Sequence, residues 1–99
     1  MGVGQQGFAN PYQKPLGYQQ VASFSTLQSG LPSPPAGATM AIIAVEGNAI
    51  RWRDDGTNAT ASVGMPVAVG QTLSYTGTFS AFTFIPQTGS ATVDITYYG

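Results

Sequence analysis

The chain has 99 residues, the size of one ordinary domain. Only 7 % of them are charged, and the net charge at pH 7 is −1. Because there is no cysteine and no histidine, the composition excludes disulfides, thiolate nucleophiles, zinc sites and imidazole base chemistry. Charged residues make up about a quarter of a typical soluble domain, and a free monomer usually needs net charge for solubility. We therefore expect a protein that is packed in an assembly; a poorly charged but soluble domain is the alternative.

Two classes of partner are not expected. Lys14, Arg51 and Arg53 are the only cations, so the chain lacks the basic patch that sequence-independent nucleic-acid binding requires. No apolar run approaches the roughly 18 residues of a membrane-spanning helix. The sequence thus predicts neither a nucleic-acid partner nor a membrane partner.

Residues 1–20 differ in composition from the rest of the chain. They are rich in Gly, Gln, Pro and Tyr, and Pro11 and Pro15 prevent a continuous helix. We predict an extended N-terminal arm over 1–20, followed by one domain over 21–99. The arm is either a floppy tail or a segment that another chain orders, by accepting its apolar side chains in pockets and its backbone at a sheet edge. The apolar side chains that would make this contact are Phe8, Tyr12, Leu16 and Tyr18.

The remaining residues predict β-strands separated by turns. The expected strands cover residues 20–27, 39–46, 50–53, 66–69, 72–76, 79–85 and 91–98. This spacing of short strands is typical of an antiparallel sandwich or barrel. The fold prediction is therefore all-β: a single antiparallel β-sandwich or jelly-roll-like domain of about seven strands.

Two of these strands carry more specific predictions. Residues 39–46 form a continuous apolar run, which favours a central strand buried on both faces. Gly47–Asn48 then predicts a tight hairpin turn into the strand at 50–53.

The alternation of apolar residues predicts the core. For residues 79–85 it leaves the buried face undecided, because both faces carry bulky apolar groups; we expect one face to lie between the sheets and the other against a partner. The expected core residues are Ile43, Val45, Trp52, Leu73, Tyr75, Phe82 or Phe84, Val93 and Ile95.

Charge is concentrated in one short stretch. The chain has three basic and four acidic residues, and five of these seven lie between Glu46 and Asp55. Arg51 and Arg53 alternate with apolar residues and are expected on the outward face, where they would bridge to carboxylates of a neighbouring subunit. The alternative is local pairing with Asp54, Asp55 or Glu46.

Catalytic and metal sites are not expected in this stretch. Asp54 and Asp55 are adjacent, so their side chains point apart, and turn formation explains them better than paired-carboxylate hydrolysis does. The run that begins at Asp54 also lacks the spacing of a calcium loop. We expect no enzyme activity, no cofactor and no metal. Tyr98, the outward aromatic of the last strand, joins Arg51, Arg53, Asp54 and Asp55 as a candidate contact residue.

The run Ile50-Arg51-Trp52-Arg53-Asp54-Asp55-Gly56-Thr57, followed by Ala61-Ser62-Val63-Gly64-Met65-Pro66, resembles small β-rich proteins encoded among the virion genes of tailed bacteriophages. The terminal run Ile95-Thr96-Tyr97-Tyr98 is similar as well, and the resemblance covers about residues 39–98. It implies a virion structural protein, assembled in the host cytoplasm, and does not specify its position in the particle.

Three functional hypotheses follow. The first is a capsid decoration or cement subunit that contacts the major capsid protein or other virion proteins and forms a homo-oligomer, with a trimer as one candidate. The second is a tail, neck or fibre-associated component. The third is a glycan- or host-surface-binding module that uses Trp52, Tyr98 and the loop at 54–64.

Overall fold

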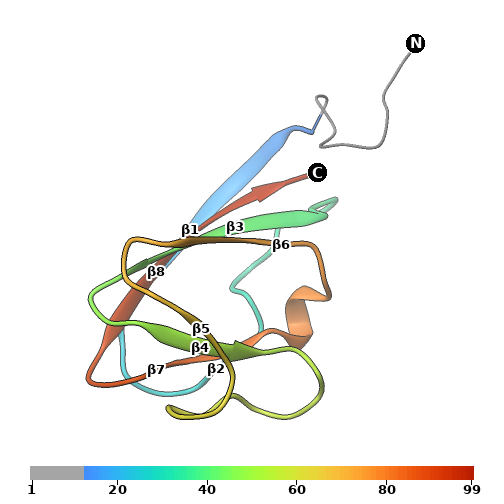
Figure 1. The fold of residues 1–99 in the computed structure, drawn as a ribbon. Helices are drawn as coiled ribbons and strands as arrows, with labels where there is room; N and C mark the ends of the chain where they lie inside the picture. Colours follow the sequence, from blue (N-terminus) through green and yellow to red (C-terminus); the bar gives the residue numbers. More distant parts are fainter. Residues whose placement is uncertain (1–12) are drawn as a thin grey trace.

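The protein is described here by a computed structural model, which defines residues 13–99. Two four-stranded antiparallel sheets pack against each other (Figure 1), so the prediction of an all-β sandwich is confirmed. Phe8 and Tyr12 lie outside the described residues. The strands are β1 (Pro15–Phe24), β2 (Gln28–Ser29), β3 (Met40–Glu46), β4 (Ile50–Arg53), β5 (Met65–Val67), β6 (Thr72–Tyr75), β7 (Thr83–Pro86) and β8 (Ala91–Tyr98).

The first sheet has the strand order β1-β8-β3-β6. In β8 every second residue is buried, from Ala91 to Tyr97, because alternate side chains of a strand point to opposite faces. The neighbouring β3 follows the same rule: Ile43 pairs with Ile95 and Val45 with Val93, and all four are buried. These four side chains form the centre of the first sheet's half of the core, to which Phe24, Ala41, Tyr75, Ala91 and Tyr97 also contribute.

The expectation that β3 is buried on both faces is wrong. It is a central strand, between β8 and β6, but Met40, Ile42 and Ala44 on its other face are only half-buried. The run is continuously apolar, yet within residues 13–99 no element covers that face of the sheet.

The second sheet has the order β2-β7-β4-β5. A short 3-10 turn, η1 (Phe79–Ala81), breaks the strand expected at 79–85, so β7 starts only at Thr83. Phe82 and Phe84 are both buried. Residues two apart in an extended strand lie on the same face, so the face that carries Phe82 and Phe84 is the one that packs in the core. Val93, Ile95 and Tyr75 are buried as expected, whereas Trp52 and Leu73 are half-buried at the edge of the core.

Two boundaries differ from the sequence predictions. β1 begins at Pro15, inside the expected arm, and one edge of residues 15–20 pairs with β8 of the same chain. Gly47–Asn48 does turn the chain, with Gly47 at φ 85°, but it leads from β3 in the first sheet to β4 in the second. The predicted hairpin is therefore a corner between the two sheets. The side-chain amide of Asn48 holds this corner by donating a hydrogen bond of 2.7 Å to the carbonyl oxygen of Ser90.

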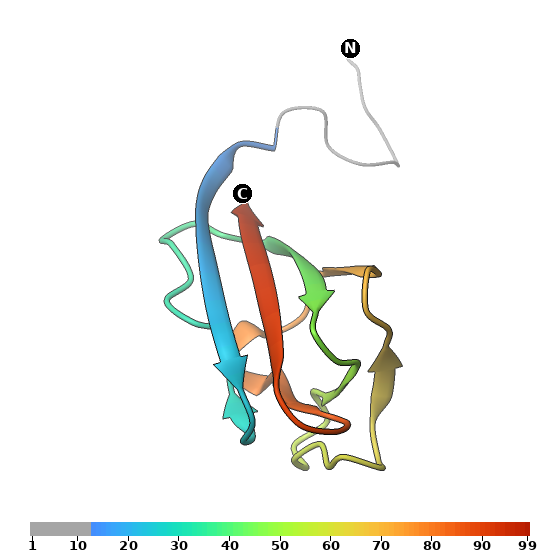
Figure 2. The same cartoon turned by 90° about the vertical axis from the view of Figure 1, so that its left-hand side faces the viewer.

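Figure 2 shows β1 and β8 running side by side along the length of the molecule, with β1 on the outside. Near the end of β1 the pairing is irregular, and Ser23 adopts a left-handed conformation with φ 48°. Such a bulge re-aims the following side chain, and Phe24 is buried with its ring edge-on to Phe84 at 5.3 Å.

Within residues 13–99, no helix has the length and apolar character to cross a membrane.

A candidate contact surface beside the β4–β5 loop

The candidate site is built on β4, whose side chains alternate as the sequence predicts. Ile50 is fully buried, and Trp52 on the same face stacks on Phe82 with ring centroids 5.0 Å apart. Tyr75 lies edge-on to the indole at 5.8 Å. One side of Trp52 thus packs in the aromatic core. The side chain as a whole is half-buried, so part of it is exposed at the surface.

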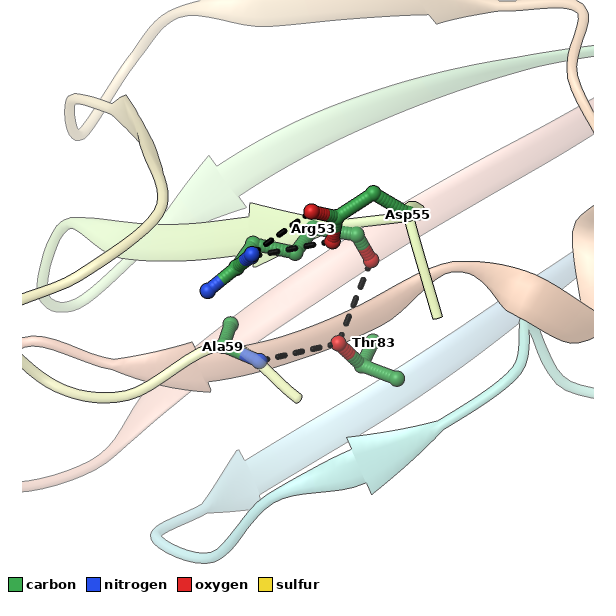
Figure 3. Close-up of polar contacts among 4 residues, drawn as sticks. All are labelled: Arg53, Asp55, Ala59 and Thr83. Atoms are coloured by element: carbon green, nitrogen blue, oxygen red, sulfur yellow. Dashed lines mark hydrogen bonds and ion pairs between the residues drawn. The ribbon is translucent and has the colours of Figure 1, made fainter. Parts of the chain in front are cut away.

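Arg53 is paired locally. Its Nε donates to Asp55 Oδ1 at 3.0 Å and its Nη2 to Asp55 Oδ2 at 2.6 Å (Figure 3). The hydrogen bond from Arg53 lowers the pKa of Asp55 below its usual value. This is the local pairing that the sequence offered as the alternative to an intersubunit bridge. Because solvent screens an exposed pair of this kind, it adds little to the stability of the domain.

Asp54 faces the first sheet. Its Oδ2 accepts a hydrogen bond of 2.8 Å from the hydroxyl of Tyr75. Burial, and then the contact with Asp54, raise the pKa of Tyr75 to about 12. The two neighbouring carboxylates therefore have separate partners from separate elements, as expected for residues whose side chains diverge.

Arg51 holds the other end of the same loop. Its Nη1 donates to the carbonyl oxygen of Gly64 at 2.9 Å, and its buried Nε has no hydrogen-bond partner within the described part of the chain. Gly64 has φ 144°, and a Cβ there would lie 3.0 Å from the carbonyl oxygen of Trp52. Only glycine allows the loop to approach β4 this closely, which explains the glycine at position 64.

Thr83 anchors the middle of the loop, a role that the sequence reasoning missed. Its buried hydroxyl donates to the carbonyl oxygen of Arg53 and accepts the N–H of Ala59, both at 3.1 Å (Figure 3). Ala59 is itself only 3 % exposed. The sequence feature that could have indicated this role is a threonine between two core phenylalanines. A hydroxyl buried there needs hydrogen-bond partners.

Two hollows lie beside this loop and share Trp52 and Met65. The first, of about 260 Å³, is lined by Trp52, Arg53, Asp54, Asp55, Val63, Gly64 and Met65. The second, of about 520 Å³, is lined by Trp52, Met65, Pro66, Val67, Gly70, Gln71, Thr72 and Leu73. They follow the side of the sandwich where β5 and β6, the last strands of their sheets, lie.

Three apolar side chains in and near these hollows are strongly exposed for their type. Met65 is 58 % exposed and Val63 51 %. Val69, in the segment between β5 and β6, is 53 % exposed. We call the apolar lining of the two hollows the Trp52 surface, defined by Trp52, Val63, Met65, Pro66 and Leu73.

The other predicted contact residues lie on the first sheet. Leu16 and Tyr18 are exposed on β1, and Tyr98 is half-buried on β8. The Tyr18 hydroxyl donates to Asp94 Oδ1 at 2.6 Å, and the Gln20 amide donates to the same oxygen at 2.8 Å. The structure thus brings Arg51, Arg53, Asp54 and Asp55 together at one loop and separates them from Leu16, Tyr18 and Tyr98.

The buried tyrosines predict a loss of stability in alkali. Burial raises the pKa of both Tyr75 and Tyr97 to about 12, whereas unfolded tyrosines ionise near pH 10. The folded state therefore binds these protons more tightly, so the stability that the two tyrosines contribute should be fully present below about pH 10 and be lost as the pH rises through about 12. Urea denaturation at several pH values measures this. Tyr75→Phe should reduce the fall, and an equal fall in that variant would contradict the assignment to Tyr75.

Within residues 13–99, no group of three or more His, Cys, Asp or Glu residues is placed to hold a metal ion. No protein-family model, curated protein or solved structure matches the chain in the comparisons with known proteins.

Proposed function

We propose that the protein is a non-enzymatic structural subunit of a tailed-bacteriophage particle, most simply a capsid decoration or cement protein whose Trp52 surface packs against the major capsid protein. The observation that carries this proposal is the exposure of Val63 and Met65 on the Trp52 surface, in a chain with so few charges. Exposed apolar patches of this kind mark interaction sites.

The energetics suit an assembly. Fully burying an exposed side chain such as Met or Val contributes about 1.5–3 kcal/mol. Val63 and Met65 are 51 % and 58 % exposed, so covering each would contribute about half of that amount. Trp52, already held by its stacking on Phe82, would serve as a rigid anchor, and tryptophan is enriched among the residues that dominate interface energies. A cement protein acts in this way, because binding only the assembled shell stabilises it by mass action.

The charged groups at the hollow support a structural rather than a catalytic role. Asp55 is bonded to Arg53 and Asp54 to Tyr75, so each carboxylate already has a partner that fixes the loop. A glycan platform made of Trp52 and Tyr98 is not favoured, because these residues belong to different sheets. The tail or neck location differs from the capsid location in copy number, which the experiment below also measures.

Met65→Asp is expected to lower the number of copies bound per particle by at least about tenfold, the effect of about 1.4 kcal/mol, because a carboxylate would be buried in the contact. Since Met65 is exposed in the free chain, the circular-dichroism spectrum and melting temperature should hardly change. Particles that lack the protein are mixed with each variant, pelleted and analysed by quantitative mass spectrometry.

The matched control is Ala36→Asp, which adds the same charge at an exposed position in the loop between β2 and β3. It should bind as the native chain does. Equal binding of both variants would refute the Trp52 surface as the contact, and a native occupancy of only a few copies would place the protein in the tail rather than on the capsid.

A further inference from the structure

The four edges of the sandwich are not equally protected. Three edge strands are short: β2 has 2 residues, β5 has 3 and β6 has 4, and β5 also contains Pro66. The fourth, β1, has 10 residues. Long free edges are templates for pairing with another strand, and proteins usually shorten them, charge them or interrupt them with proline.

β1 carries almost none of these protections. It has no charged residue from Pro15 to Phe24, and its proline is at its first position. Irregular pairing with β8 is confined to its two ends, between Pro15 and Gly17 and between Val21 and Phe24. The stretch Gly17–Val21 is in regular register with β8 and has no strand on its other side within residues 13–99. Figure 2 shows this outer side of β1 along the border of the sheet.

A second copy of the same strand fits this edge. Alternate residues of an antiparallel strand direct their backbone N–H and C=O groups to opposite sides, so the groups of Gly17–Val21 that do not face β8 point outward. A twofold axis at Gln19 would place Gln19 opposite its own copy, Tyr18 opposite Gln20, and Gly17 opposite Val21. Like charges opposite each other destabilise a strand pair, and none of these residues is charged.

The nearest charge on the strand beside β1 is also compatible. Asp94 on β8 is bonded to Tyr18 and Gln20 of its own chain. The two copies of Asp94 would be separated by three strand spacings, about 14 Å, which exceeds the Debye length of about 8 Å at physiological ionic strength.

We propose that two copies of this protein pair through β1 around a twofold axis at Gln19 and so join their first sheets into one continuous antiparallel sheet. The pairing uses a different surface from the Trp52 surface. It does not depend on which virion protein covers that surface, and it would allow one assembled subunit to link to the next.

Cysteine cross-linking of the purified full chain tests this pairing without particles, so its failure is distinct from a failure of the capsid proposal. Because the native chain has no cysteine, Gln19→Cys can form only an intermolecular disulfide. Residues opposite each other have Cα atoms about 4.5–5.5 Å apart, within the disulfide range of about 4.4–6.8 Å. Ala22→Cys is the matched control in the same strand, since its two copies would lie about 20 Å apart.

Under mild oxidation, Gln19→Cys should form a covalent dimer at least tenfold faster than Ala22→Cys on a non-reducing gel. Equal rates, or no dimer, would overturn the proposal. Gln19→Glu and Gln19→Lys give a second test that does not depend on the cysteine variant folding. Each alone should sediment as a monomer, and an equimolar mixture should restore the dimer. A mixture that stays monomeric, or single variants that dimerise as the native chain does, would also overturn it.

Discussion

Replacing Phe82 with alanine is expected to lower the free energy of unfolding by about 3–5 kcal/mol. Phe82 is fully buried. The centroid of its ring lies 5.0 Å from the ring centroid of Trp52, 4.7 Å from that of Tyr75 and 5.6 Å from that of Phe84. It therefore connects the second sheet to the first through aromatic contacts that add to its area burial. Domains of this size are stable by only about 5–15 kcal/mol, so much of the total would be lost.

Urea denaturation followed by tryptophan fluorescence measures this loss directly, because Trp52 is the only tryptophan and touches the substituted ring. Phe82→Leu is the control, since it keeps most of the apolar volume and should lose clearly less. A loss below about 1 kcal/mol for Phe82→Ala would contradict the central position of this ring.

Thr83→Val should lower the free energy of unfolding by about 1–3 kcal/mol although it conserves the shape of the side chain. The substitution removes the hydroxyl that bonds both the carbonyl oxygen of Arg53 and the N–H of Ala59. Ala59 is buried, so its donor would lose its partner in a site that water does not easily reach. The middle of the 54–64 loop, at Ala59, would then detach from β7.

Hydrogen exchange adds a local measurement to this prediction. The amide of Ala59 should exchange much faster in Thr83→Val than in the native chain, whereas Thr83→Ser, which keeps the hydroxyl, should retain most of the protection. A valine variant with native stability and a protected Ala59 amide would show that Thr83 does not anchor the loop.

Strands with clear periodicity could be predicted from the sequence. The strands expected at 50–53 and 91–98 match β4 and β8 to within a residue, because apolar and polar side chains alternate along them. β2 is only two residues long and carries no usable pattern. β1 was expected to start later because the Gly, Gln and Pro content of its first half resembles a disordered segment.

The way the strands combine into sheets could not be predicted from local patterns. Gly47–Asn48 has the composition of a hairpin turn, but turn chemistry does not say whether the next strand pairs with the previous one or enters the other sheet. The clustering of Arg51, Arg53, Asp54 and Asp55 was visible in the sequence because they are neighbours in the chain. Their partners Gly64 and Tyr75, and the anchor Thr83, come from other parts of the chain. These contacts could be identified only from the three-dimensional structure.

Methionine footprinting of the native chain tests whether the Trp52 surface is covered in the assembled particle. Met65 is 58 % exposed in the free protein and should be oxidised readily by dilute peroxide, whereas a covered thioether reacts slowly. Met40, half-buried on the outward face of β3, reports the general reactivity of the sample. We predict that oxidation of Met65 slows by at least about tenfold in particles that carry the protein, beyond any change at Met40; an unchanged rate at Met65 would contradict the account.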